Sequence, residues 1–398
     1  MGSHYLFLSV ANHGSIMPTL PLVAELTRRG HRVTYVTWGE YAPAVARAGA
    51  VVVEYDSPYA SANPAEVFAD PDPMRPHQIY IDENVAIMHA AQDHVAGTLP
   101  DLIAYGDSPI LAGQILARAW QRPACRLFPG FGSNQVYSYH ADMIAKSGGI
   151  ESWVQEAIYE RVGALLARYA IEDTPAELYN RIEDFNLVFI PREFQIAAES
   201  FDARFAFVGR FTPPAGDWQP PADGLPVVLV SLGTTFNDRP ELYRACAEAF
   251  DGAPWHAVLT TGDRLGPGDL GAMPPNVEAH RWVPYGAVLA HAKVFVTNGG
   301  MGAVMESVGA GRPMVAVPQS FDAMPMAGQV ARLGLGVMIE PGQLTAGRLR
   351  AAVQEVAGDQ AMLARVREMA QQARLAGGAA RAASELTAYL SRSRVASR

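Results

Sequence analysis

Apolar runs alternate with helical patterns along the chain. The run YLFLSV at residues 5–10 predicts a strand, and HRVTYVT at residues 31–37 predicts a second one. Between them, four apolar residues fall on one helical face: Ile16, Leu20, Val23 and Ala24. This helix should end at Arg28, Arg29 and Gly30, because cations in the last turn followed by glycine are typical of a helix C-terminus. A strand, a helix and a strand in this order form a βαβ unit, which implies a parallel sheet covered by helices.

A stretch rich in Pro and Gly at residues 205–226 interrupts this alternation, which resumes after it. Strands are then predicted at residues 226–233, 255–262, 276–282, 292–298 and 313–319, with a helix at residues 241–250. Residues 360–392 are helical in pattern, with a break at Gly377 and Gly378. We expect four parts: an N-terminal domain over residues 1–210, a linker over 211–225, a second domain over 226–378, and a C-terminal helix over 379–398 that could pack on either domain.

Composition and charge narrow the class of protein. The 398 residues are 49% hydrophobic and 18% charged, which is ordinary for a globular protein. The net charge of −9 argues against a nucleic-acid partner, because neutralising phosphates needs clustered Lys and Arg. Cys125 and Cys246 lie far apart, so no disulfide framework is indicated. We expect a cytoplasmic protein, because no apolar run is long enough to span a membrane and the start lacks the basic region of a signal peptide. Met1 to His4 are left out of these expectations.

The loops that follow the predicted strands carry the candidate chemistry. Thr297-Asn298-Gly299-Gly300-Met301-Gly302 stands between a strand and a helix. Such glycines let a phosphate approach the backbone and the helix N-terminus, although a tight packing turn is the alternative. The spacing is not the GxGxxG of dinucleotide-binding proteins, which argues against a nicotinamide enzyme. Glu306, in the following helix, is either an acceptor for ribose hydroxyls or an exposed helix charge.

Three other strand ends have two interpretations each, and a fourth carries a histidine. Ser231 to Thr235 could donate hydroxyls to phosphate or cap a helix. Trp282 could stack on a nucleobase or belong to the core. Asp322 could accept from sugar hydroxyls or cap a helix. His13, in SVANHGSIMPTL after the first strand, is incidental if it is considered alone.

Taken together, these motifs resemble a known family. WVP at residues 282–284, TNGGMGAVMESV at 297–308 and AVPQSFD at 316–322 occur in that order, with VSLGTTF at 230–236 before them. With the N-terminal segment at residues 9–37, this order resembles family 1 glycosyltransferases of the GT-B fold, most closely the bacterial branch that glycosylates macrolides, enediynes and other natural products. The resemblance implies an α/β protein in which two Rossmann-like domains turn their parallel sheets toward a central cleft. It also implies an inverting glycosyltransferase that uses a dTDP-sugar or UDP-sugar and a hydrophobic acceptor.

The resemblance assigns roles to individual residues. His13 matches the general base, and Asp107, aligned on the following ILARAW segment, matches its carboxylate partner; a helix N-cap is the alternative for Asp107. Trp282 would stack on the base, Glu306 would bind the ribose, and Asp322 would contact the sugar. The full set expected at the nucleotide-sugar is Gly14, Ser231, Gly233, Thr234, Trp282, Val283, Asn298, Gly299, Gly300, Met301, Gly302, Ala303, Glu306, Asp322 and Ala323. No metal or other cofactor is expected, because N–H donors and the helix dipole would stabilise the leaving diphosphate.

Three positions depart from the family pattern. Asn298 stands where relatives often have His, Tyr285 where many have Gln, and Ala323 where glucose-using relatives have Gln. Losing the Gln amide would leave a sugar hydroxyl unpaired, so we expect a deoxy or amino-deoxy sugar. The sequence offers no account of Tyr285.

The acceptor is expected on the N-terminal domain, in loops over residues 57–95 and 126–150 that are rich in Pro, Phe, Tyr, Met and His; ordinary surface loops are the alternative. A homodimer stays possible. The alternatives to a transferase are a nucleotide-sugar epimerase of the same architecture and a non-catalytic auxiliary protein.

Overall fold

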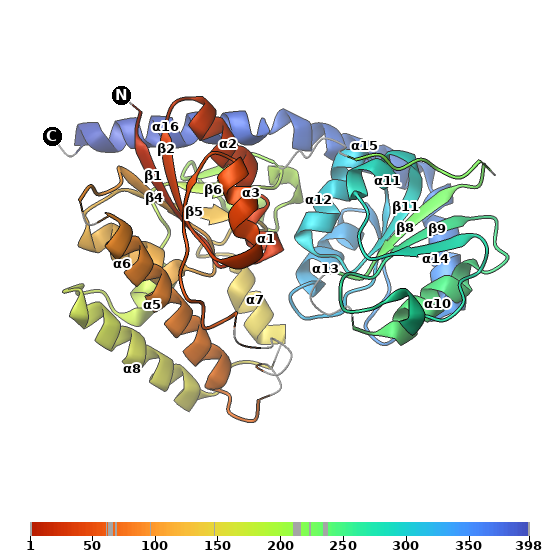
Figure 1. The fold of residues 1–398 in the computed structure, drawn as a ribbon, viewed down its shortest axis with the longest axis horizontal. Helices are drawn as coiled ribbons and strands as arrows, with labels where there is room; N and C mark the ends of the chain where they lie inside the picture. The colour runs from red at the N-terminus through yellow and green to blue at the C-terminus, as the bar shows by residue number, and fades with distance from the viewer. Residues whose placement is uncertain are drawn as a thin grey trace.

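The computed structural model describes residues 2–60, 62, 67, 70–95, 97–146, 148–209, 216–222, 224–233 and 238–396. They form two lobes, each built around one parallel sheet (Figure 1). Thr234 and part of the expected linker, residues 211–215 and 223, lie outside this description. The expectation of an α/β protein with two parallel sheets is confirmed.

The first sheet has the strand order β3-β2-β1-β4-β5-β6-β7. Its strands are β1 (His4–Leu8), β2 (Arg32–Val36), β3 (Val51–Val53), β4 (Leu102–Tyr105), β5 (Ala124–Phe128), β6 (Asn186–Val188) and β7 (Phe205–Phe207). The helices of this lobe include α1 (His13–Ile16), α2 (Leu20–Arg28), α3 (Ala42–Arg47), α5 (Arg75–Val95), α6 (Ile110–Ala119), α7 (Tyr139–Lys146), α8 (Ser152–Arg168) and α9 (Pro175–Asn180).

The predicted βαβ unit is present, but its single helix is divided into α1 and α2. Asn12 caps α1, because its side-chain oxygen accepts the N–H of Ser15 at 2.8 Å. Pro18 then lacks the N–H needed to continue the helix, and α2 begins at Leu20. The predicted end is confirmed, since α2 stops at Arg28 and Gly30 has a φ of 83°.

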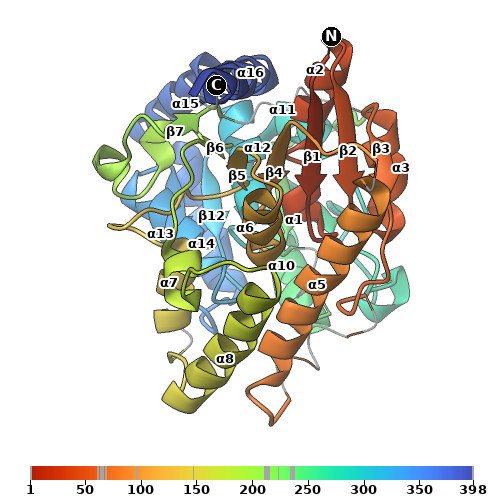
Figure 2. The ribbon, with the colours of Figure 1, turned by 90° about the vertical axis from the view of Figure 1, so that its left-hand side faces the viewer.

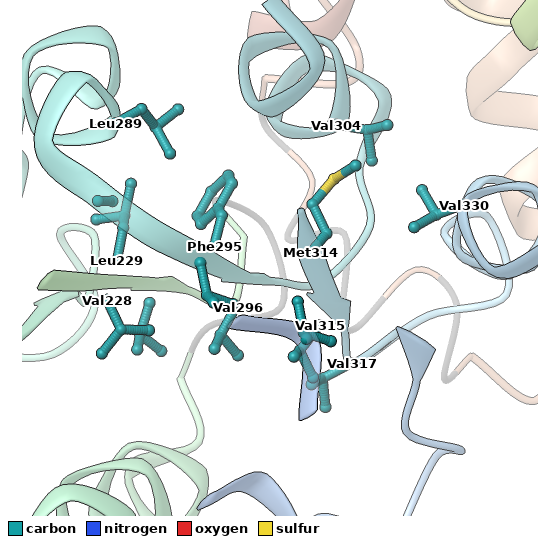
Figure 3. Close-up of a cluster of buried hydrophobic side chains, with 14 of the residues drawn as sticks. Val228, Leu229, Leu289, Phe295, Val296, Val304, Met314, Val315, Val317 and Val330 are labelled. Atoms are coloured by element: carbon teal, nitrogen blue, oxygen red, sulfur yellow. The ribbon is translucent and has the colours of Figure 1, made fainter. Parts of the chain in front are cut away.

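The second sheet has the order β10-β9-β8-β11-β12-β13. Its strands are β8 (Val227–Ser231), β9 (His256–Thr260), β10 (Val277–His280), β11 (Ala292–Thr297), β12 (Met314–Ala316) and β13 (Gly336–Met338). Its helices include α10 (Pro240–Phe250), α11 (Tyr285–His291), α12 (Met301–Ala310), α13 (Met324–Arg332) and α14 (Ala346–Gly358). Leu229, Phe295 and Met314 are in register, and in Figure 3 they point to the side of the sheet where Leu289 and Val304 lie. The opposite sides of the same strands carry Val228, Val296 and Val315, so this sheet is buried on both faces.

The C-terminal segment reaches both lobes. α15 (Gln360–Leu375) packs against α12, and α16 (Gly378–Ala396) packs against α2 beside the first sheet (Figures 1 and 2). Arg29 fixes this second contact by donating to the carbonyl of Ala380 at 2.8 Å. The break between the two helices falls at Gly377, whose φ is 88°. Within the described ranges, no helix is long and apolar enough to cross a membrane.

Candidate active site

His13, Asp107, Gly233 and Asn298 lie where the strand order of each sheet reverses. This reversal lies between β1 and β4 in the first sheet and between β8 and β11 in the second. Ligands of open α/β sheets bind outside the carboxyl ends of the strands at such points. His13 follows β1 and Asp107 follows β4, while Gly233 and Asn298 follow β8 and β11. Figure 1 shows α1 on the side of the first lobe that faces the second, and α12 and α13 on the opposing side of the second lobe.

The sequence suggested that His13 lies on an open loop. In the structure, His13 is instead the first residue of α1. The cap by Asn12 turns the chain into a helix at this residue. The His13 carbonyl accepts the N–H of Met17 at 3.2 Å, while its side chain is exposed together with Gly14. The imidazole is therefore carried by a capped helical turn directly after a fully buried strand.

Asp107 makes an ion pair with Arg126 of β5. The Arg126 Nε and Nη2 atoms lie 3.0 and 2.9 Å from the same oxygen, Oδ1 of Asp107. The helix-cap alternative is wrong, since Pro109 is the N-cap residue of α6 and no side chain caps that helix. The side chain of Asp107 is 37% exposed and that of Arg126 only 12%. Burial raises the pKa of Asp107 above its usual value, and Arg126 opposes this effect.

The expectation that residues 57–95 and 126–150 are loops is wrong in part, because they include the helices α5 (Arg75–Val95) and α7 (Tyr139–Lys146). Both helices contribute side chains near Arg126 or Asp107. His77 and Tyr80 come from α5, and Tyr139 and His140 come from α7. The pKa of His140 is lowered by burial first, and then by the charges of Arg126 and His77. The pKa of Tyr139 is raised by burial and then by the carboxylates of Asp322 and Asp107. Aromatic and imidazole side chains from these helices thus lie near the ion pair of Asp107 and Arg126.

The glycine-rich turn after β11 forms an anion-binding geometry at the start of α12. Gly300 is the N-cap residue and α12 has no side-chain cap. The first intrahelical bond runs from Val304 N to Gly300 O at 3.0 Å, so the N–H groups of Met301, Gly302 and Ala303 precede the helical hydrogen-bond ladder. Such N–H groups and the helix dipole favour a phosphate at this end.

Asn298 and Gly233 are in close contact beside this turn. The Asn298 backbone N–H donates to Ser231 O at 3.1 Å, and Asn298 Oδ1 accepts the N–H of Gly300 at 3.1 Å. Gly233 has a φ of 101°, and a Cβ there would lie 2.5 Å from Asn298 Nδ2. Glycine at position 233 therefore allows Asn298 to sit against the β8 loop.

Ser231 is buried, and its hydroxyl pairs with the hydroxyl of Tyr285. Tyr285 OH also lies 3.4 Å from Thr260 Oγ1. Ser231 does not cap the helix that follows this loop. The N-cap residue of α10 is Arg239, and no side-chain hydrogen bond caps that helix. Tyr285, a departure that the sequence did not explain, thus forms a hydrogen bond with the Ser231 hydroxyl. The sequence analysis expected that hydroxyl to donate to phosphate.

Trp282 lies on the surface, so the core alternative for this residue is wrong. Its side chain is 50% exposed, and its Nε1 donates to Asp263 Oδ2 at 3.1 Å. Val283 beside it is half-buried, as is Glu306 on α12. The pKa of Tyr285 on α11 is raised mainly by burial and additionally by the charge of Glu306 on α12, the helix that packs against α11.

Asp322 and Ala323 lie beside the phosphate turn. Asp322 is exposed, and no side chain caps α13, which excludes the cap alternative for it. Ala323 is buried, and a Cβ added to Gly299 would lie 3.6 Å from its carbonyl oxygen. Across the junction, a Cβ on Gly130 of the first lobe would lie 3.7 Å from Met301 Cε. A surface cavity of about 600 Å³ between β3 and α5 is lined by none of the residues expected at the base or at the nucleotide-sugar, although part of its lining comes from the segment at residues 57–95.

Two doubly wound sheets with facing strand ends define the fold as GT-B. The model of the C-terminal domain of erythromycin biosynthesis protein CIII-like proteins matches residues 254–387. The chain is 34% identical to the demethyllactenocin mycarosyltransferase of Streptomyces fradiae, over 98% of this chain and 87% of the relative. It is 32% identical to the oleandomycin glycosyltransferase of Streptomyces antibioticus, over 98% and 91%.

A solved structure of the calicheamicin glycosyltransferase CalG4 superposes with a TM-score of 0.91 at 44% identity, covering 98% of this chain and 99% of that one. The chain therefore belongs to the family 1 GT-B glycosyltransferases of the natural-product type, and it is an enzyme of that family.

Proposed function

We propose that this enzyme transfers a deoxy or amino-deoxy sugar from a dTDP-sugar, or from the corresponding UDP-sugar, to a hydroxyl group of a hydrophobic aglycone, with inversion at the anomeric carbon. One observation carries the proposal: His13 and Asp107 flank the reversal point of the first sheet, and the uncapped start of α12 lies at that of the second. A base and an anion site on opposing lobes suit a reaction between two substrates.

In the proposed mechanism, His13 takes the proton of the acceptor hydroxyl while that oxygen attacks the anomeric carbon. The bond from this carbon to the diphosphate breaks, and the N–H groups at the start of α12 stabilise the leaving charge. Asp107 would stabilise the imidazolium of His13. Because Arg126 occupies Oδ1 of Asp107, Oδ2 is the oxygen that would serve His13.

The second sheet supports an extended nucleotide. Trp282 follows β10, and the phosphate turn follows β11, three strand spacings away in the order β10-β9-β8-β11. Three spacings correspond to roughly 14 Å. Trp282 would stack on the base, Glu306 near Tyr285 would bind the ribose, and Met301 would lie at the diphosphate.

The sugar is proposed from Ala323. A methyl group cannot pair with a sugar hydroxyl, and an unpaired buried hydroxyl costs about 1–3 kcal/mol. A sugar without that hydroxyl avoids this cost. The name of the mycarosyltransferase relative and those of the other glycosyltransferases favour sugar transfer over an epimerase or an auxiliary protein.

The test is a donor panel of UDP-glucose, dTDP-glucose and dTDP-rhamnose with macrolide and polyphenol aglycones. We expect transfer from the dTDP-deoxy sugar to exceed transfer from UDP-glucose. Faster turnover with UDP-glucose would overturn the sugar assignment, and no transfer from any donor would overturn the proposed activity.

The general base is tested with His13→Ala. We expect a loss of about 100-fold or more in turnover with an unchanged affinity for dTDP, because His13 lies on the first lobe. Full turnover by this variant would refute the role of His13.

A further inference from the structure

One hydrogen bond joins the two lobes at the loop expected to contact the donor sugar. The hydroxyl of Tyr139 donates to the backbone carbonyl of Asp322 at 2.9 Å. Tyr139 is the first residue of α7 on the acceptor lobe, and Asp322 precedes α13 on the donor lobe. The two helices are in contact and lie side by side in Figures 1 and 2.

We propose that Tyr139 is a positioning residue that holds the loop at residues 318–323 so that the Asp322 carboxylate meets the donor sugar. The proposal rests on the proposed function, which places the sugar at Asp322. Asp322 carries this contact without help from its neighbour, because Ala323 has no polar group. The direction of the Asp322 carboxylate therefore depends on how the backbone of this loop is held.

Tyr139 is itself held firmly on the acceptor lobe. Its backbone N–H donates to Ser133 Oγ at 3.2 Å, and its ring lies 6.4 Å from that of buried Phe131. Phe131 stacks on Phe194, with ring centroids 5.8 Å apart and planes inclined by 5°. The phenol thus projects from a packed aromatic cluster, which suits it to fix a loop of the other lobe.

The same cluster holds α13 at a second point. Gln329 of α13 is buried, and its Nε2 donates to the carbonyl of Phe194 at 2.8 Å. This bond fixes the middle of the helix, whereas the bond from Tyr139 fixes the loop before it. Removing the phenol hydroxyl should therefore release the sugar loop while α13 stays in place.

Tyr137 provides a matched control. Its ring packs on the same Phe131 at 6.0 Å, and its buried hydroxyl has no hydrogen-bond partner among the described residues. Tyr137→Phe and Tyr139→Phe each remove one hydroxyl from the same aromatic cluster. Only the second removes a bond between the lobes.

The experiment compares the two variants with the wild type by titration calorimetry, using dTDP and dTDP-rhamnose as probes. We expect Tyr139→Phe to weaken binding of dTDP-rhamnose by about two- to tenfold, the range for one neutral hydrogen bond, and to leave dTDP affinity unchanged. Tyr137→Phe should change neither. In the Asp322→Ala background, Tyr139→Phe should have no further effect on dTDP-rhamnose.

Two results would overturn the proposal. If Tyr139→Phe behaves like Tyr137→Phe, the bond does not position the sugar loop. If both probes weaken equally, Tyr139 acts on the lobes as a whole and not through Asp322. The activity of the wild type tests the proposed function separately. If the wild type transfers sugar, the proposed function stands whatever the variants show; if it transfers none, the proposed function fails before the role of Tyr139 is tested.

Discussion

The stability of the first lobe should depend on pH through His4. This residue lies in β1, is 8% exposed, and pairs through Nε2 with Thr34 Oγ1 at 2.8 Å. Its Nδ1 is buried without a partner among the described residues. Burial first, and then the charge of Arg32, lower the pKa of His4 from 6.5 to about 4, although Asp101 opposes the shift.

The sign follows from proton binding. Between pH 6.5 and pH 4, the unfolded chain binds a proton at His4 that the folded chain does not bind. Acid therefore favours the unfolded state, and the stabilisation present above pH 6.5 is lost as the pH falls toward 4. Between pH 7.5 and pH 5, the loss from this residue amounts to about 2 kcal/mol.

The measurement is urea unfolding followed by hydrogen exchange of peptides from the first sheet, which separates this lobe from the second. His4→Gln keeps a polar side chain beside Thr34 but does not titrate. We expect the wild type to lose about 2 kcal/mol more than His4→Gln between pH 7.5 and pH 5. Equal losses in the two proteins would refute the assignment of a depressed pKa to His4.

Three further predictions concern the active site. Arg126→Met removes the cation that opposes the raised pKa of Asp107, so the acid limb of the pH profile of kcat/KM should move to higher pH. Arg126→Lys should move this limb less. An unchanged limb would show that Asp107 does not act in catalysis. Trp282→Ala should weaken dTDP binding in calorimetry at least about fivefold, whereas Trp282→Phe should retain most of it, and equal affinities would exclude stacking. Gly233→Ala would place a Cβ 2.5 Å from Asn298 Nδ2 at a φ of 101°. The variant should therefore have a lower dTDP affinity and a lower Tm than the wild type. A variant that keeps both values would show that the loop can shift.

Periodicity predicted the strands of the second sheet except β13, but it did not indicate α5 or α8, the long helices of the first lobe. The apolar runs at residues 226–233 and 292–298 became β8 and β11, because strands covered on both faces are nearly continuous in apolar residues. β3, β6, β7 and β13 are three residues long, which is too short for a period to be visible, whereas β12, of the same length, was predicted because its apolar run continues to Val317. The division between α1 and α2 depends on the cap by Asn12, which begins α1, and on Pro18, which prevents its continuation; apolar spacing encodes neither.

The sequence predicted only part of the candidate site. His13 and Asp107 came from the resemblance, and the sheet topology brings their strands together. Arg126 was missed, although a charged residue inside the apolar run ACRLF is a signal, since a buried charge needs a partner. The bond from Tyr139 to Asp322 joins residues 183 positions apart, and no spacing in the sequence indicates it.

The departures from the family pattern on the donor side have connected physical consequences. Tyr285 occupies the Ser231 hydroxyl, and Asn298 uses its amide oxygen to hold Gly300. The donors proposed for the diphosphate are then mainly the neutral N–H groups at the start of α12. Neutral dipoles stabilise a charge only when they are well aligned, because their field falls off faster than that of a cation. This requirement explains why Gly233 and Gly299, both with positive φ, stand beside the turn, since they let neighbouring loops approach it closely. Donor affinity should therefore respond more strongly to small changes of this backbone than to loss of the Asn298 amide.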